Sequence, residues 1–203
     1  MSSTSSYTSL VEKLDRFIRK YYTNQLIRGA IFSVVYVLAF FLAINLLEYY
    51  FYLSPLLRKI LFFGFIFSSL AFLAAFFVQP LLHYYRLGKI ISYEQAAVII
   101  GTHFTEVKDK LLNILQLHQA SATQESQLLL AAIDQKAVEL KPVDFTFAID
   151  LNKNRKYLKY LAPPALLFLF IIIAAPNVIK EGTKRLYHND TFYEKEAPFR
   201  FVV

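Results

Sequence analysis

The polar stretch GTHFTEVKDKLLNILQL, residues 101–117, gathers side chains that could do acid–base or metal chemistry. It holds one histidine, two carboxylates and two lysines within a few helical turns: His103, Glu106, Lys108, Asp109 and Lys110. Helical spacing, however, places the histidine on the apolar side of one helix and the four charged residues on a solvated face of the next. Glu106 and Lys110 are four residues apart, in the order that favours an ion pair on an exposed helix. We therefore interpret the stretch as structural.

The rest of the chain offers no pattern typical of catalysis or metal binding. The four histidines, His83, His103, His118 and His188, lie far apart, and none has a carboxylate at metal-ligand spacing. The sequence has no cysteine, which excludes thiolate catalysis, and no P-loop, dinucleotide fingerprint or nucleophile elbow. We expect a protein that is not an enzyme and that binds no cofactor and no metal.

The composition is typical of integral membrane proteins. Hydrophobic residues make up 56% of the 203 residues and charged residues only 18%, a balance foreign to soluble domains. Three runs approach the roughly 20 apolar residues that a helix needs to cross a bilayer: 29–53, 60–82 and 160–179. The predicted fold class is all-α integral membrane, with three transmembrane helices, a small cytoplasmic helical insert between the second and third, and an N-terminal amphipathic helix.

The distribution of lysine and arginine predicts the orientation, because these residues accumulate in cytoplasmic loops. They are frequent before the first span and between the second and third, and scarce in the SPLLRK loop of the hairpin. The N-terminus and residues 86–156 are therefore expected in the cytoplasm and the C-terminus outside. The net charge of +7 is assigned to contact with anionic lipid and not to nucleic acid. The predicted domains are 1–28 (basic helix), 29–85 (transmembrane hairpin), 86–156 (insert), 157–179 (third span) and 180–203 (linker).

The insert reads as three short amphipathic helices. Ser92 with Gln95, and Ser121 with Gln124, form the pattern of a capping box, and Thr105 can cap the helix between them. The middle helix carries an apolar stripe that must be covered, and we interpret it as a docking face for a partner: Val107, Leu111, Ile114 and Leu115. Residues 143–149 alternate apolar and polar side chains, which predicts a strand.

Few polar residues fall inside the spans, and each is a candidate for function because burial in lipid is costly. They are Asn45, Glu48 and Gln79. Glu48 is followed at once by Tyr49 and Tyr50, so we expect it to reach interfacial water. A role in proton or ion conduction stays open as the alternative.

Small residues recur at helical spacing in the first two spans and allow helices to approach closely. The second span carries Gly64, Ser68, Ala71 and Ala75, and the first carries Ala39 and Ala43. The favoured interpretation is packing within the hairpin. The alternative is contact with a second copy or with a partner.

The N-terminal segment is predicted to be a basic amphipathic helix. Ser9 and Glu12 have the spacing of a capping box, and Leu10, Leu14 and Phe17 fall on one face. A helix of this kind ahead of a span is expected to lie in the lipid headgroups. The alternative is packing on the rest of the protein.

The order of these elements resembles the start of a large bacterial inner-membrane protein family of unknown function, common in Bacteroidetes-type bacteria. The resemblance is most specific at residues 100–117, IG-x-HF-x-E-x-KDKLLN-x-LQL, and includes the final APFRFVV. It implies that the chain continues into a periplasmic β domain, and it carries over no catalytic residue.

The function expected is therefore a non-enzymatic inner-membrane anchor and assembly module for a larger periplasmic region. Expected partners are the lipid bilayer, other envelope proteins and a second copy of the chain. The alternative is an accessory subunit of a transporter, secretion system or other energised envelope complex.

Overall fold

The computed structural model describes residues 3–87, 90–121 and 127–193, and within these it is helical without a strand. Two compact units divide the chain. Unit 1 comprises residues 1–26 and 80–153, and unit 2 comprises residues 27–79 and 154–203. The first helix, α1 (Ser3–Phe51), contributes to both units.

Three helical runs are long and apolar enough to cross a membrane, as predicted: Ser6–Phe51, Pro55–Tyr84 and Phe145–Ala174. The second run contains α2 (Pro55–Leu73), a π-helical segment (Ala74–Val78) and α3 (Gln79–Tyr84). The third contains α7 (Arg155–Ala174), with Pro163 and Pro164 inside it. The hairpin turn is shorter than the predicted SPLLRK loop. Because Pro55 occupies the first turn of α2, where a missing N–H costs little, the residues from Leu56 on are already helical.

Within unit 2, aromatic side chains join α1 to α2. The rings of Tyr36 and Phe72 stack at 4.5 Å between centroids, and Phe40 meets Phe65 edge to face at 5.5 Å. At one point the backbones come close: a Cβ added to Gly29 would lie 1.7 Å from the carbonyl oxygen of Phe76 in the π-helical segment. Gly29 is therefore the residue that lets the two helices cross there.

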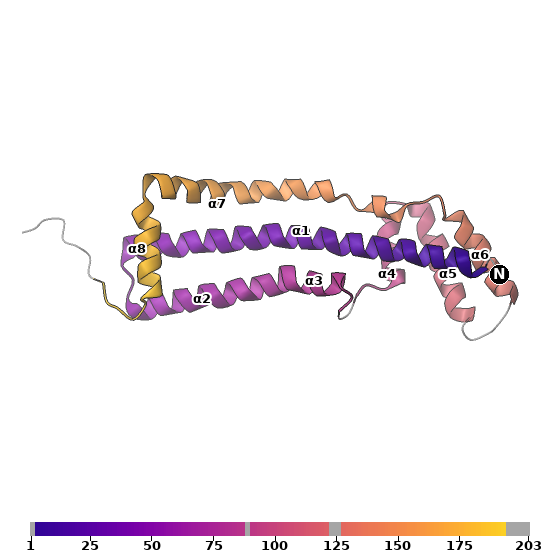
Figure 1. Ribbon diagram of the computed structural model, residues 1–203, viewed down its shortest axis with the longest axis horizontal. Helices are drawn as coiled ribbons and strands as arrows, with labels where there is room; N and C mark the ends of the chain where they lie inside the picture. The colour runs from indigo at the N-terminus through magenta and orange to yellow at the C-terminus, as the bar shows by residue number, and fades with distance from the viewer. Residues whose placement is uncertain (1–2, 88–89, 122–126, 194–203) are drawn as a thin grey trace, which may run out of the picture. The chain divides into compact units, whose positions relative to one another are not determined.

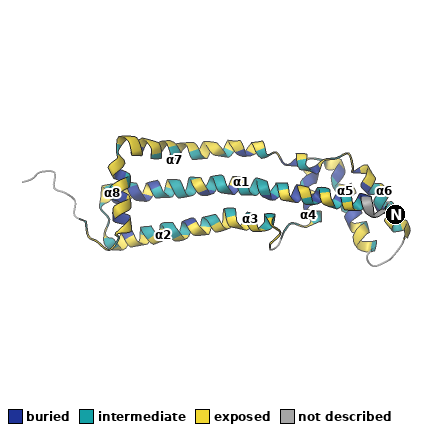
Figure 2. Cartoon of the chain, viewed as in Figure 1, coloured by how far each residue is buried: buried dark blue, intermediate teal, exposed yellow. Residues whose placement is uncertain are grey.

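The small-residue faces do not pack within the hairpin, contrary to the favoured interpretation. Ala39 and Ala43 of α1 are exposed, as are Gly64 and Ala71 of α2 and Ala75 of the π-helical segment, while Ser68 is half-buried. An added Cβ on Gly64 would meet nothing within 4 Å. The bulky aromatic rings fill the space between α1 and α2 and leave the small residues outside. Figure 2 shows how much of α2 is exposed.

The predicted linker after the third span is in part a helix, α8 (Pro176–Tyr187). Figure 1 shows α8 running across the ends of α1, α2 and α7. Its buried residues lie on one face, at a spacing of three or four: Val178, Gly182, Arg185 and Leu186. Val178 packs into a small apolar cluster with Leu42 of α1 and Ile171 of α7. The end of the predicted linker, 194–203, lies outside the described residues.

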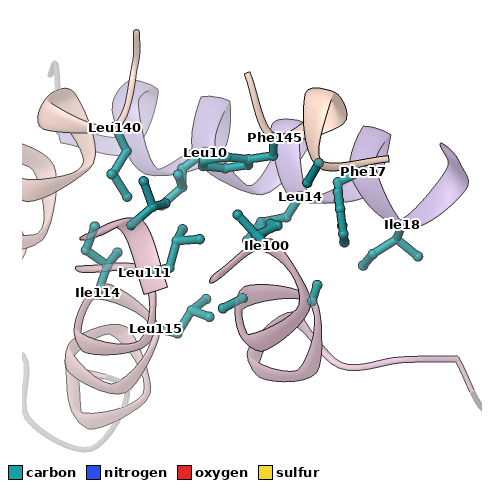
Figure 3. Close-up of a cluster of buried hydrophobic side chains, with 14 of the residues drawn as sticks. Leu10, Leu14, Phe17, Ile18, Ile100, Leu111, Ile114, Leu115, Leu140 and Phe145 are labelled. Carbon is teal, nitrogen blue, oxygen red and sulfur yellow. The ribbon is translucent and has the colours of Figure 1, made fainter. Parts of the chain in front are cut away.

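Unit 1 is a helical bundle built on the N-terminal part of α1. It adds α4 (Tyr93–Gly101), α5 (Thr105–Ser121) and α6 (Gln127–Glu139). Figure 3 shows the core, in which side chains of α1 meet those of α4 and α5. Leu14 and Phe17 are fully buried. The N-terminal apolar face is thus covered by protein and not by lipid headgroups, which corresponds to the alternative left open above.

The basic residues of this helix also serve the bundle. The Lys13 ammonium group donates hydrogen bonds to the carbonyl oxygens of Leu140 (3.4 Å), Lys141 and Val143 (3.0 Å). These carbonyls follow the C-terminus of α6, where a positive charge is favourable. Lys20 donates to the carbonyl oxygen of Thr146 at 2.9 Å.

Capping was predicted with mixed success. The Ser92–Gln95 capping box of α4 is confirmed, with both reciprocal hydrogen bonds present. The Ser9 box is wrong, because α1 begins at Ser3 and Ser9 lies inside the helix. Ser121 ends α5 instead of starting a helix. α6 begins at Gln127, and Gln124 lies outside the described residues.

The predicted strand at 143–149 is wrong. Residues Phe145–Ala148 form a 3-10 turn, followed by a second one at Leu151–Asn154. Asp144 begins the first turn by accepting a hydrogen bond from the Thr146 N–H at 3.0 Å. Phe145 is buried while Phe147 is exposed, so the alternation reflects a turn lying on the core and not a pleated edge.

Candidate functional site

The polar stretch at 101–117 is divided between a turn and α5. His103 does not pack on an apolar face as predicted, since it is exposed in the turn after α4. Its Nδ1 lies 3.3 Å from the Thr102 hydroxyl. Lys110 pairs with Glu139 of α6 at 2.9 Å, and both side chains are about half exposed. The charged residues therefore form a solvated surface, as expected.

The predicted docking face is already occupied. Val107, Leu111, Ile114 and Leu115 are buried in the core of unit 1. Figure 3 shows Leu111, Ile114 and Leu115 within the cluster of buried side chains that also includes residues of α1 and α4. An amphipathic pattern requires that the stripe be covered but does not say by what, and here the protein itself covers it. This face cannot receive a partner in the folded unit.

A polar cluster in unit 2 is the strongest candidate site. Glu48 near the end of α1 accepts a hydrogen bond from Arg58 at the start of α2, with 2.8 Å between Oε1 and Nη2. Both side chains are fully buried. The prediction that Glu48 reaches interfacial water is therefore wrong. The turn brings the two residues together because Arg58 is the fourth residue of α2, directly across the hairpin.

Arg58 is further bound by backbone. Its guanidinium group donates to the carbonyl oxygens of Leu53 (2.9 Å) and Thr191 (2.6 Å). Thr191 follows α8, so one side chain links the hairpin turn to the segment after the third span. In the sequence, Arg58 was only a basic residue of the predicted loop. The signal that was missed is the opposite charge of Glu48, ten positions earlier.

Asn45 joins the same cluster from α1. It is fully buried, donates to the Phe41 carbonyl at 2.9 Å and accepts from the Thr183 hydroxyl of α8 at 2.9 Å. Gly182 permits this approach, because a Cβ there would lie 2.7 Å from the Asn45 side-chain oxygen. Gln79, the third predicted polar residue, is exposed at the start of α3 and takes no part in the cluster.

A second arginine, Arg185 of α8, lies among aromatic rings. It is 9% exposed, and its Cζ lies 4.1 Å from the centre of the Tyr52 ring. The Tyr193 ring lies 5.7 Å from this Cζ and 4.9 Å from the Cζ of Arg58. Tyr52 has a φ of 49°, a left-handed conformation unusual for such a residue.

The described residues contain no group of three or more histidine, aspartate or glutamate side chains that could hold a metal. The cluster also offers no nucleophile next to a general base. Its chemistry is that of ion pairing, hydrogen bonding and cation–π contact.

Unit 2 also contains an apolar cleft of about 530 Å³. Residues of α1, α2, the π-helical segment and α7 line it: Ala30, Ser33, Val34, Val37, Leu38, Phe41, Phe65, Leu73, Phe77 and Phe168. The Ser33 hydroxyl is buried and has no hydrogen-bond partner among the residues described. A comparison of the chain with protein-family models, with curated proteins and with solved structures found no match.

Proposed function

We propose that this protein is a non-enzymatic inner-membrane anchor and assembly module. The observation that carries the proposal is the use made of polar groups in unit 2. Glu48 is paired with Arg58, and Asn45 with Thr183. Each pair fastens one helix to another, so the buried polar groups stabilise a membrane fold. They do not line a path for an ion or a substrate.

Assembly is assigned to the small-residue faces of α1 and α2. The exposed small residues in unit 2 are Ala39 and Ala43 on α1, Gly64 and Ala71 on α2, and Ala75 on the π-helical segment that continues α2. Helices in lipid associate through such faces because the backbones can approach closely. The partner is another membrane helix, from a second copy of the chain or from an envelope protein.

In the proposed orientation, residues 86–156 lie in the cytoplasm and α8 in the periplasm. This arrangement agrees with the excess of basic residues before the first span and around the insert. The anchor is preferred to a subunit of an energised complex, because the pairing with Arg58 gives the one intramembrane carboxylate a structural role.

Disulfide crosslinking in native membranes tests the assembly faces. The natural chain has no cysteine, so single variants Ala39→Cys and Ala71→Cys report on one position each. We expect both to form specific crosslinked species under mild oxidation. The matched control is Ala162→Cys, an exposed alanine of α7.

Equal crosslinking at position 162 would mean random collision in the bilayer and would contradict the assignment of these faces. Absence of any crosslinked species at positions 39 and 71 would contradict it as well. The size of a crosslinked species distinguishes a second copy from a different protein.

A further inference from the structure

The helix α8 separates two kinds of surface. Its buried face lies on the ends of the spans, and the opposite face exposes basic and polar residues: Asn177, Lys180, Lys184, Tyr187 and His188 just beyond it. The three spans are apolar enough to cross a bilayer, and α8 runs across their ends in Figure 1. In a membrane, this places α8 at the level of the lipid headgroups.

The buried charges beneath α8 do not balance. Two guanidinium groups, those of Arg58 and Arg185, lie next to the Tyr193 ring, but only one carboxylate, that of Glu48, is paired there. Glu48 neutralises Arg58. The positive charge in excess therefore belongs to Arg185, which has no ion pair among the described residues.

Arg185 also has unused hydrogen-bond donors. Its Nε and Nη1 are buried and have no hydrogen-bond partner in the part of the chain that the structure describes. A buried guanidinium without an acceptor is costly, and a planar fork of N–H groups matches the oxygens of a phosphate.

We propose that Arg185 binds a phosphate group on the buried face of α8. Two sources carry this chemistry at the level of the headgroups, an anionic phospholipid and free phosphate. The Tyr52 and Tyr193 rings flank the guanidinium, at 4.1 Å and 5.7 Å from its Cζ. The site is separate from the small-residue faces, so the test of phosphate binding does not depend on the proposed assembly role.

The test measures ligand binding by the purified chain in detergent. Binding is detected by native mass spectrometry and by the shift in the midpoint temperature of thermal unfolding. Three probes separate the sources: phosphatidylglycerol, inorganic phosphate, and a diacylglycerol that lacks the phosphate. We expect phosphatidylglycerol to bind and to raise the midpoint above that with diacylglycerol. In Arg185→Gln the affinity falls about tenfold or more, as expected for loss of charge-assisted hydrogen bonds.

The matched control is Lys184→Gln, which removes a positive charge from the exposed position directly before Arg185. We expect it to leave the affinity within about twofold, because exposed charges contribute little. Arg185→Lys keeps the charge without the planar fork and is expected to fold with weakened binding. Binding of inorganic phosphate with the same dependence on Arg185 supports the site and assigns it to free phosphate. Equal affinity in Arg185→Gln and the natural protein, an equal loss in Lys184→Gln, or no preference for phosphatidylglycerol or phosphate over diacylglycerol overturns the proposal.

Discussion

At the scale of single residues, the structure predicts opposite effects on stability when two glycines of unit 2 are replaced by alanine. A Cβ at Gly29 would lie 1.7 Å from the Phe76 carbonyl oxygen, while one at Gly64 would meet nothing within 4 Å. Because backbone atoms cannot yield as a flexible side chain does, we expect Gly29→Ala to destabilise the protein by about 1–3 kcal/mol, the range for overpacked sites. Chemical unfolding in detergent measures the change.

Gly64→Ala is the matched control at an exposed helical position. Alanine has the better helix propensity, so the substitution is expected to be neutral or to stabilise by up to about 1 kcal/mol. Equal unfolding free energies for the two variants would show that α1 does not approach the π-helical segment closely at Gly29.

The ion pair between Glu48 and Arg58 gives a second residue-scale prediction. Glu48→Gln leaves a fully buried guanidinium without its counter-charge, which is expected to cost about 3–5 kcal/mol. Replacing both residues by leucine removes the two buried charges together and should recover most of this loss. The free energy of unfolding of the two single leucine variants and of the double variant forms a mutant cycle that measures the coupling.

The same variants bear on function. If Glu48→Gln abolished a transport activity while leaving the unfolding free energy unchanged, the carboxylate would serve conduction and the anchor would be the wrong interpretation. The pairing with Arg58 leads us to expect the reverse.

At the scale of elements, the turn that begins at Asp144 should depend on pH. The hydrogen bond from the Thr146 N–H lowers the pKa of the Asp144 carboxyl group. A carboxyl group with a lower pKa in the folded state stabilises that state above the unfolded pKa of about 3.9, and the contribution disappears as the pH falls through the folded value. Asp144→Ala should therefore cost about 1 kcal/mol near pH 7 and progressively less below about pH 4.

Urea unfolding of the natural protein and of Asp144→Ala at several pH values checks this expectation. Asp144→Asn keeps an acceptor oxygen for the Thr146 N–H without a titrating proton, so it separates the hydrogen bond from the charge. A difference between the natural protein and Asp144→Ala that stays constant down to pH 3 would contradict the prediction.

The sequence predicted which helices form better than it predicted what covers their apolar faces. The three spans and the Ser92–Gln95 box depend on local composition and spacing, and both are confirmed. The cover of an apolar stripe depends on the tertiary fold, so the stripe on α5 was assigned to a partner although α1 covers it.

The candidate site was predicted only in part, for the same reason. Asn45 and Glu48 stood out because polar groups are rare in spans. Arg58 and Arg185 did not, because basic residues are common at span ends and only the folded chain brings these two to the same ring. Gln79 has the same rarity in the sequence but lies exposed.

At the scale of the whole molecule, three crossings determine which segments share a side of the membrane. If α1, α2–α3 and α7 each cross once, as we propose, residues 90–150 are expected on the side of the N-terminus and α8 on the other. Single cysteines at two exposed positions, Glu106→Cys in α5 and Lys184→Cys in α8, test this in intact cells. We expect a membrane-impermeant thiol reagent to label position 184 alone before lysis and both positions after it.

Labelling of position 106 in intact cells would reverse the proposed orientation. Labelling of both positions before lysis would contradict an odd number of crossings.

Unit 1 is discontinuous in sequence, and this has a consequence for the order of synthesis. Its first part ends at residue 26 and its second begins at residue 80, after the transmembrane hairpin. On a ribosome adding about 5–20 residues per second, Leu14 and Phe17 emerge on the order of ten seconds before Phe145, the last fully buried aromatic residue of their core. During that interval the apolar face of the N-terminal part of α1 is uncovered. A targeting factor or chaperone that binds apolar helices can bind it in that time.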